Sequence, residues 1–165
     1  RKGFAYSRKK ITLSTVGLPG AMARLAADGP GVELAISLHA ADDSLRNGLI
    51  PVNRRHPIVE VLRAGADYAR QANAKVTIEY MLIGGINDTD EDAVRLGLLA
   101  RQYSMPVNLI RFNPVAGVDF DASPSERIDA FARRLLAEKV RATVRRSRGA
   151  SIRAACGQLA GQARP

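Results

Sequence analysis

The sequence predicts an α/β fold in which strands and helices alternate around a parallel sheet. Segments rich in Val, Ile and Leu alternate along the chain with segments whose apolar residues recur at helical spacing. The 165 residues suffice for one domain with a substantial core, and no internal repeat, low-complexity tract or linker interrupts them. We therefore expect a single domain over residues 1–165. Right-handed crossovers should place its helices on one face of a curved sheet or outside a barrel.

The first part of the chain contains two strands and three helices. Residues 10–16 (KITLSTV) form the first strand, and residues 19–29 a short helix with Pro and Gly at its ends. Residues 32–40 (VELAISLHA) form the second strand, and residues 42–50 a short helix that begins at an Asp. A longer helix follows at 57–73, where the apolar residues keep near-helical spacing.

The middle of the chain continues the alternation. Residues 75–83 (KVTIEYMLI) form the third strand, which the sequence GGIN ends with a turn. Residues 89–103 form a helix whose first turn holds acidic residues, as the helix macrodipole favours. The fourth strand covers 106–112, and the loop 113–124 follows it.

The last segments are a helix, a strand and a short helix. The helix covers 125–139, with Ser125 or Ser123 as its candidate N-cap. The fifth strand covers 141–147, and the final short helix covers 151–161.

Ligands of such folds bind at the carboxyl ends of the strands. These ends carry small or polar side chains, which suit hydrogen bonds to a small cofactor: Ser14, Thr15, Ser37, His39, Asn87 and Asn113. By spacing alone, the two serines fit turn or cap residues better than ligand contacts. His39 fits a structural histidine equally well, and Asn113 before a proline fits a turn.

The charge and the cysteine content restrict the partners and the compartment. With 25 Lys and Arg against 16 Asp and Glu, the net charge of +9 predicts attraction to a polyanion, most often nucleic acid. A basic surface that only aids solubility is the alternative. The basic residues concentrate at 1–10 and 133–153. No apolar run is long enough for a membrane span, and one cysteine makes no internal disulfide, so we expect a cytoplasmic protein without a membrane partner.

No group of residues has the spacing of metal ligands. The acidic residues Asp88, Asp90, Glu91 and Asp92 are expected to form a solvated helix start. The chain also has no phosphate-binding glycine loop. We therefore expect no metal-ligating residue in this chain.

Cys156 is the single cysteine of the chain, in the sequence RAACGQLAG. Arg153 and a predicted helix start at 151 precede it, and both features lower a thiol pKa. A reactive thiolate and an inert buried cysteine are equally compatible with its position.

Five motifs resemble one family when taken together: ITLSTVG, AISLHAADDSLRNGLIPVN, VTIEYMLIGGIND, VNLIRFNPVAG and IRAACGQLAG. In order and spacing they are similar to the C-terminal two-thirds of the radical-SAM domain of the RlmN/Cfr family, from about Lys9 to Gly161. The resemblance implies the later strands and helices of a partial, TIM-like (β/α) barrel. It also implies methylation of adenine in 23S ribosomal RNA, and in some transfer RNAs for the RlmN branch.

The resemblance implies a role for each matching residue. Ser14 contacts S-adenosylmethionine, Ser37, Leu38 and His39 line its pocket, and Asn113 does likewise. Cys156 becomes the S-methylcysteine, whose methyl carbon is activated by a 5′-deoxyadenosyl radical and added to the adenine ring. Lys9, Lys10, Arg145, Arg146 and Arg148 are candidate contacts to RNA phosphates.

The family's CxxxCxxC motif for a 4Fe–4S cluster, its Gly-Glu motif and its resolving cysteine have no counterpart in this chain. We therefore expect the C-terminal portion of an enzyme that is inactive alone, with an open sheet edge where barrel strands are missing. The cluster would also need a reductant. The alternatives are a non-catalytic protein that binds RNA or S-adenosylmethionine, and a Cfr-like methylation at adenine C8. The sequence CGQLAG favours methylation at C2 modestly.

Overall fold

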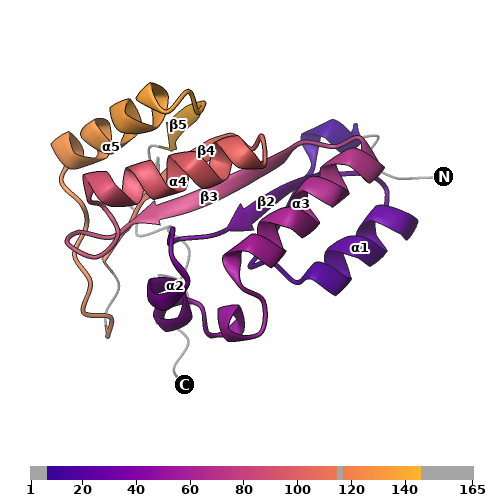
Figure 1. Ribbon diagram of the computed structural model, residues 1–165, viewed down its shortest axis with the longest axis horizontal. Coiled ribbons are helices and arrows are strands. Elements are labelled where there is room, and N and C mark those ends of the chain that lie inside the picture. Colours follow the sequence, from indigo (N-terminus) through magenta and orange to yellow (C-terminus); the bar gives the residue numbers. More distant parts are fainter. Residues whose placement is uncertain (1–6, 115–116, 146–165) are drawn as a thin grey trace, which may run out of the picture.

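The computed structural model describes residues 7–114 and 117–145. Its strands form one parallel sheet in the order β1-β2-β3-β4-β5, as the alternating pattern predicts. Figure 1 shows the long helices on one side of this sheet. The strands are β1 (Thr12–Thr15), β2 (Glu33–Ser37), β3 (Val76–Leu82), β4 (Val107–Arg111) and β5 (Ala142–Arg145). The helices are α1 (Pro19–Asp28), α2 (Asp43–Leu49), α3 (Ile58–Ala72), α4 (Asp90–Gln102) and α5 (Ser125–Ala137).

Several expected boundaries differ from the observed ones. The observed first strand, β1, is shorter than the expected strand 10–16, because the 3-10 helix η1 (Arg8–Lys10) precedes it. The expected strand at 32–40 ends at Ser37, because the chain turns at His39. A second 3-10 helix, η2 (Pro51–Arg54), follows α2 and was not predicted. The last two residues of the expected strand 141–147 and the expected helix 151–161 lie outside the described residues.

The predicted serine cap of α5 is wrong. The N-cap of this helix is Pro124, with no side-chain cap. Ser123 is buried instead, and its hydroxyl donates to Asp88 Oδ2 at 2.8 Å. The serine therefore fastens the loop before α5 to the turn after β3.

The core lies between the sheet and the helices. Burial alternates along β3, so that Val76, Ile78, Tyr80 and Leu82 face the helices. The ring of Tyr80 stacks on Phe131 of α5, with centroids 5.5 Å apart. Tight packing also explains Gly65 of α3, where an added Cβ would lie 2.6 Å from Ile36 Cδ1.

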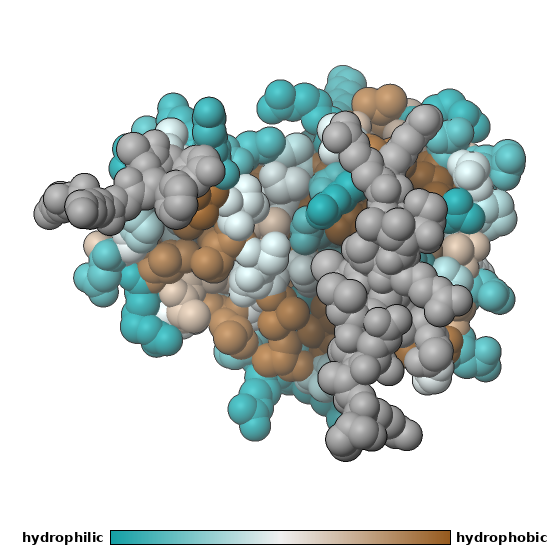
Figure 2. Space-filling view, turned by 180° about the vertical axis from the view of Figure 1, so that it is seen from behind, coloured by the Kyte–Doolittle hydropathy of each residue, from teal (hydrophilic) through white to brown (hydrophobic). Residues whose placement is uncertain are grey.

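The opposite side chains of the strands form a face that no described helix covers. Figure 2 shows this side of the molecule, where polar and apolar surfaces alternate. Strand register places Thr12, Ser14 and Ser37 on this helix-free face, with Glu79 and Asn108 on the neighbouring strands. Thr12 and Ser14 are exposed, and Ser37, Glu79 and Asn108 are partly exposed.

The edge strand β1 is unusually apolar for an exposed segment. It pairs with β2 on one side only. Ile11, Leu13, Val16 and Leu18 are each more than 40% exposed, along and just beside this strand. Natural edges are normally blunted by charge or by cover, so this edge has the composition of an interior strand.

Candidate functional site

The predicted site residues Ser14 and Ser37 lie on the same face of adjacent strands. Ser14 pairs in register with Ala35, two residues before Ser37, and side chains two residues apart share a face. Ser37 pairs in register with Glu79 of β3. Both serines therefore lie on the helix-free face near the carboxyl ends of β1 and β2. We call the four residues Ser14, Ser37, His39 and Asn113 the carboxyl rim.

Leu38 points the other way. Its side chain is fully buried in the core between the sheet and the helices. Its amide N–H donates to the Glu79 carbonyl at 2.9 Å and extends the sheet by one bond. Any contact of Leu38 with a ligand on the helix-free face therefore has to come from the backbone, not from the side chain.

His39 replaces the next bond of the sheet with its side chain. In a regular parallel ladder, the Met81 amide would donate to the carbonyl of residue 38. It donates instead to His39 Nδ1 at 3.1 Å. The backbone of His39 turns into the left-handed region at φ 60°, which is rare for a residue with a Cβ. Such a conformation persists only where the surroundings hold it on several sides.

The environment of His39 keeps its imidazole neutral. Burial, and then the positive charge of Arg46, lower its pKa from 6.5 to about 4. Because Nδ1 accepts a hydrogen bond from the backbone, the single ring proton resides on Nε2. His39 is thus the structural histidine that spacing allowed, and its neutral ring carries an N–H at Nε2.

Arg46 of α2 ties the ends of β1 and β2 together from below. The residue is completely buried. Its Nε donates to the Leu38 carbonyl at 2.9 Å, which is the carbonyl that the ladder leaves free. Its Nη2 donates to the carbonyls of Val16 at 2.7 Å and Ser37 at 3.2 Å. Burial lowers the pKa of Arg46, and Asp43 partly offsets the effect.

Asn53 of η2 completes this network. Its Oδ1 accepts from Arg46 Nη1 at 2.6 Å. Its Nδ2 donates to Asp43 Oδ1 at 2.9 Å and to Asn47 Oδ1 at 2.8 Å. Asp43 also accepts from the amide of Ile58 at 2.9 Å, which holds the start of α3. Arg46 and Asn53, both buried, are therefore the centre of a polar network under the carboxyl rim.

Gly17 lets the end of β1 approach α3. Its φ of 92° favours glycine, and an added Cβ would lie 2.3 Å from Val61 Cγ1. Its amide donates to Thr15 Oγ1 at 3.1 Å. The sequence STVG thus serves as a tight turn directly after Ser14, and Thr15 is used within this turn.

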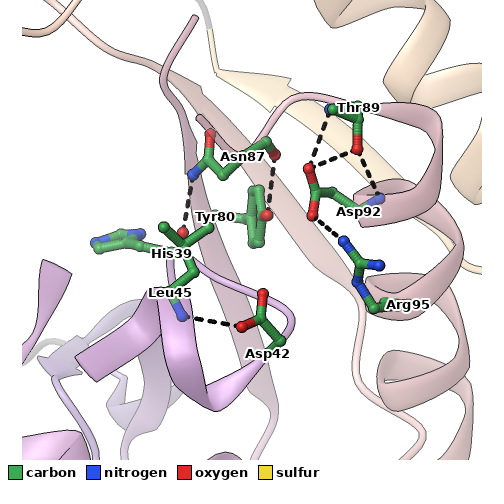
Figure 3. A network of polar contacts seen from close by, with 8 residues as sticks. All are labelled: His39, Asp42, Leu45, Tyr80, Asn87, Thr89, Asp92 and Arg95. Carbon is green, nitrogen blue, oxygen red and sulfur yellow. Dashed lines mark hydrogen bonds and ion pairs between the residues drawn. The ribbon is translucent and has the colours of Figure 1, made fainter. Parts of the chain in front are cut away.

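Asn87 forms the corresponding clamp at the end of β3 (Figure 3). Its Nδ2 donates to the carbonyls of His39 at 2.8 Å and Met81 at 2.7 Å, and its Oδ1 accepts from the amide of Ile83 at 2.7 Å. The Tyr80 hydroxyl donates to the Asn87 carbonyl at 3.0 Å. Asn87 is completely buried, so the expectation that it faces a cofactor is wrong.

The acidic segment after β3 is only partly solvated. Asp92 forms a capping box with Thr89 and an ion pair with Arg95 at 2.6 Å, as Figure 3 shows. Asp88 is also buried and accepts from the Gly85 amide at 3.0 Å. The expected helix start is confirmed, but these two carboxylates serve structure and not solubility.

In residues 7–114 and 117–145, no three His, Cys, Asp or Glu side chains gather as metal ligands would. Within the same ranges, no helix has the length and apolar character needed to cross a membrane.

Comparison with known proteins identifies the relatives of the chain. No protein-family model matches it. It is 46% identical over 157 residues to a probable dual-specificity RNA methyltransferase RlmN of Chlorobium phaeobacteroides, covering 95% of the chain and 43% of the relative. It is 44% identical over 160 residues to the dual-specificity RNA methyltransferase RlmN of Pelobacter propionicus, covering 97% and 46%.

Solved structures agree with this relationship. A radical SAM methyltransferase from Sphaerobacter thermophilus matches with a TM-score of 0.88 and 45% identity, over 93% of the chain and 45% of that protein. The chain matches the C-terminal part of RlmN-type radical SAM methyltransferases. A domain of pyruvate-formate lyase-activating enzyme from Bacteroides vulgatus shares the fold alone, with a TM-score of 0.63 at 14% identity over 82% of the chain and 80% of that domain.

The chain spans less than half the length of these RlmN relatives. Of the residues that the resemblance assigned, Ser14 and Ser37 share the helix-free face of adjacent strands, and His39 follows Ser37 by two residues. Asn113 follows β4 by two residues at the same edge of the sheet and is half-buried. Cys156, Arg146 and Arg148 lie outside the described residues.

Arg46 and Asn53 lie under the carboxyl rim, and sequence reasoning did not single them out. Both lay inside a quoted motif, but arginine and asparagine are usually exposed. A signal was present nonetheless, because polar residues at helical spacing stand among the apolar residues of LRNGLIPVN. Only the three-dimensional contacts reveal that one guanidinium serves three strand-end carbonyls.

Proposed function

We propose that the chain is the C-terminal, cofactor-binding portion of an enzyme that methylates adenine C2 in 23S ribosomal RNA and transfer RNA. The observation that carries this proposal is the 44–48% identity to RlmN RNA methyltransferases over at least 95% of the chain. The described residues add a ready polar face at the edge of the sheet where ligands of such folds bind.

The carboxyl rim fits S-adenosylmethionine chemically. Ser14 and Ser37 are small, so that a ligand can approach the strands, and their hydroxyls both donate and accept. The cofactor carries a sulfonium cation, which a charged imidazole would repel. His39 offers an N–H donor without charge, because its pKa is about 4. When bound, S-adenosylmethionine supplies the methyl group, and the residues of the carboxyl rim, Asn113 included, would hold and orient it.

Cys156 is the proposed acceptor of that methyl group. A thiolate is the nucleophile that methyl transfer from a sulfonium requires. The carbon is then delivered to an adenine that has left its stack, since a stacked ring carbon cannot be reached. The basic surface of the chain would hold the RNA phosphates. We place this reaction in the cytoplasm.

The chain does not fit an iron–sulfur cluster. A cluster bound by three cysteines needs more thiols than the one in this sequence. Cluster ligands and the resolving cysteine therefore have to come from sequence that precedes the matched region in the relatives. We propose that residues 1–165 are one incomplete barrel domain. The apolar edge of β1 supports this, because upstream barrel strands would cover Ile11, Leu13 and Val16.

The test joins the chain to the preceding segment of the Chlorobium relative and expresses it in a bacterial strain that lacks its own RlmN. We expect 2-methyladenosine in 23S ribosomal RNA digests by mass spectrometry, and none with Cys156→Ala. The 165-residue chain alone should give no product and no cluster absorbance after reconstitution with iron and sulfide. Formation of 8-methyladenosine would favour the Cfr-like alternative. The control is the same preceding segment joined to the relative's own C-terminal part. An active control together with an inactive fusion of this chain would favour a non-catalytic binding protein.

A further inference from the structure

The amino edge of the sheet, opposite the carboxyl rim, carries a row of basic side chains. Parallel strands all begin at this edge, on the right in Figure 1 where β2 and β3 start. Lys75 directly precedes β3, and Arg141 directly precedes β5. The amino-edge strip, as we define it, consists of Arg8, Lys9, Lys75, Arg101, Lys139 and Arg141.

The side chains of the amino-edge strip line two shallow hollows. One is lined by Arg8, Lys9 and Lys75, with Glu33 as its single acidic residue. The other is lined by Arg101, Lys139 and Arg141 and by no acidic residue. The six cations therefore gather in two hollows, three in each, and are not scattered over the helix surfaces.

The charges of the strip are largely uncompensated. All six residues are exposed. Within the described part of the chain, only Arg101 forms an ion pair, a long one of 4.0 Å to Glu138. By contrast, several basic residues on the helix surfaces pair closely with acids, as Arg95 does with Asp92 at 2.6 Å. An uncompensated row of cations attracts a polyanion.

We propose that the amino-edge strip binds RNA phosphates and is a second RNA contact surface, separate from the carboxyl rim. From β1 to β5 it spans about 19 Å, four strand spacings of about 4.8 Å, which is enough for several nucleotides. Along β3, a strand of seven residues separates Lys75 from the turn at the carboxyl end by about 23 Å. The hollows offer charge and no large exposed apolar side chain, which suits phosphate contact without base readout.

The choice of RNA as the polyanion rests on the proposed function, whereas the location of the strip does not. A large RNA with one adenine at the rim needs additional anchoring at a distance, which a phosphate-binding strip supplies. The strip includes Lys9, one of the basic residues expected to contact RNA, and puts it at the edge opposite the rim.

The test measures RNA binding by the 165-residue chain without S-adenosylmethionine, using fluorescence anisotropy of a labelled RNA hairpin of about 20 nucleotides. The strip variant combines Lys75→Gln, Lys139→Asn and Arg141→Gln. The control combines Arg24→Gln, Arg63→Gln and Arg133→Gln, which are exposed on α1, α3 and α5 and remove the same charge. Circular dichroism verifies that both variants keep the fold. Lys75→Gln with Arg141→Gln serves if the triple variant does not.

We expect the strip variant to bind about tenfold or more weakly in low salt, and the control within about threefold of the parent. The slope of log affinity against log salt should fall by about 2–3 for three lost phosphate contacts. Equal weakening of both variants, or an unchanged strip variant, overturns the proposal. Equal affinity for a DNA duplex of the same length overturns the assignment to RNA. Because no methyl transfer is measured, failure of the proposed reaction leaves this result unaffected.

Discussion

Replacing the buried Arg46 with methionine should destabilise the protein more than any surface substitution. Methionine fills a similar length of space but donates no hydrogen bond. The carbonyls of Val16, Ser37 and Leu38, and the side-chain oxygen of Asn53, would then lose their donor. The bonds to Leu38 and Asn53 are buried and those to Val16 and Ser37 are partly buried, so water replaces the guanidinium only in part.

The magnitude follows from two opposing terms. Each hydrogen bond to a charged group contributes about 1.5–3 kcal/mol net, and four such contacts are lost. Removing the cation also relieves its desolvation, which offsets part of the loss. Breaking a buried charged network from one side costs about 3–5 kcal/mol in total. We expect this loss in the free energy of unfolding for Arg46→Met. Arg46→Lys should recover little, because an ammonium cannot reproduce the planar fork.

The assay is urea unfolding of the 165-residue chain, followed by circular dichroism. Arg63→Met on the exposed side of α3 is the control and should change the free energy of unfolding by about 0.5 kcal/mol or less. Asn53→Leu combined with Arg46→Met should cost less than the sum of the single variants, because the two side chains are in contact. A loss below about 1 kcal/mol for Arg46→Met would refute the reasoning.

Three further predictions concern the rim and the core. The folded pKa of His39, about 4, lies below the unfolded value of 6.5. As the pH falls, the unfolded chain therefore takes up the proton first. The contribution of His39 to the free energy of unfolding is complete above pH 6.5 and falls by up to about 1.4 kcal/mol per pH unit down to pH 4. Denaturation across this range checks the slope, which His39→Asn should reduce. Gly65→Ala should cost about 1–3 kcal/mol, because the new Cβ would lie 2.6 Å from Ile36 and 2.9 Å from Met105. Thermal unfolding should show it, and an unchanged midpoint would contradict the packing. Asn87→Ala should cost about 2–3 kcal/mol by leaving three backbone groups unpaired, and hydrogen exchange after β3 should accelerate. Unaltered exchange there would argue against the clamp.

The sheet and its helices were predictable because their signals are local. In β3 the side chains alternate between the core and the helix-free face, as expected for a strand over the run KVTIEYMLI. The helix-free face at Ser14 and Ser37 follows from the same period of two. Helix α4 begins at Asp90, one residue inside the expected range. Its start was predictable because the capping residues lie next to it in the sequence.

The polar network under the rim was not predictable because its contacts are not local. Arg46 Nη2 meets the Val16 carbonyl across 30 residues of sequence. The left-handed turn at His39 depends on Asn87, which lies 48 residues further on. An arginine in an amphipathic helix is normally exposed, so its burial becomes evident only when the free carbonyls at the ends of β1 and β2 are known. Such a conflict between local preference and position is typical of functional sites.

Mass spectrometry of Cys156 tests the central claim most directly. The chain, joined to the preceding segment of an RlmN relative and purified in active form, is digested and its cysteine peptide is weighed. We predict an increment of about 14 Da, one methyl group, on Cys156, as methyl transfer to a thiolate requires. An unmodified Cys156 in active enzyme, or full activity of Cys156→Ala, would contradict the account.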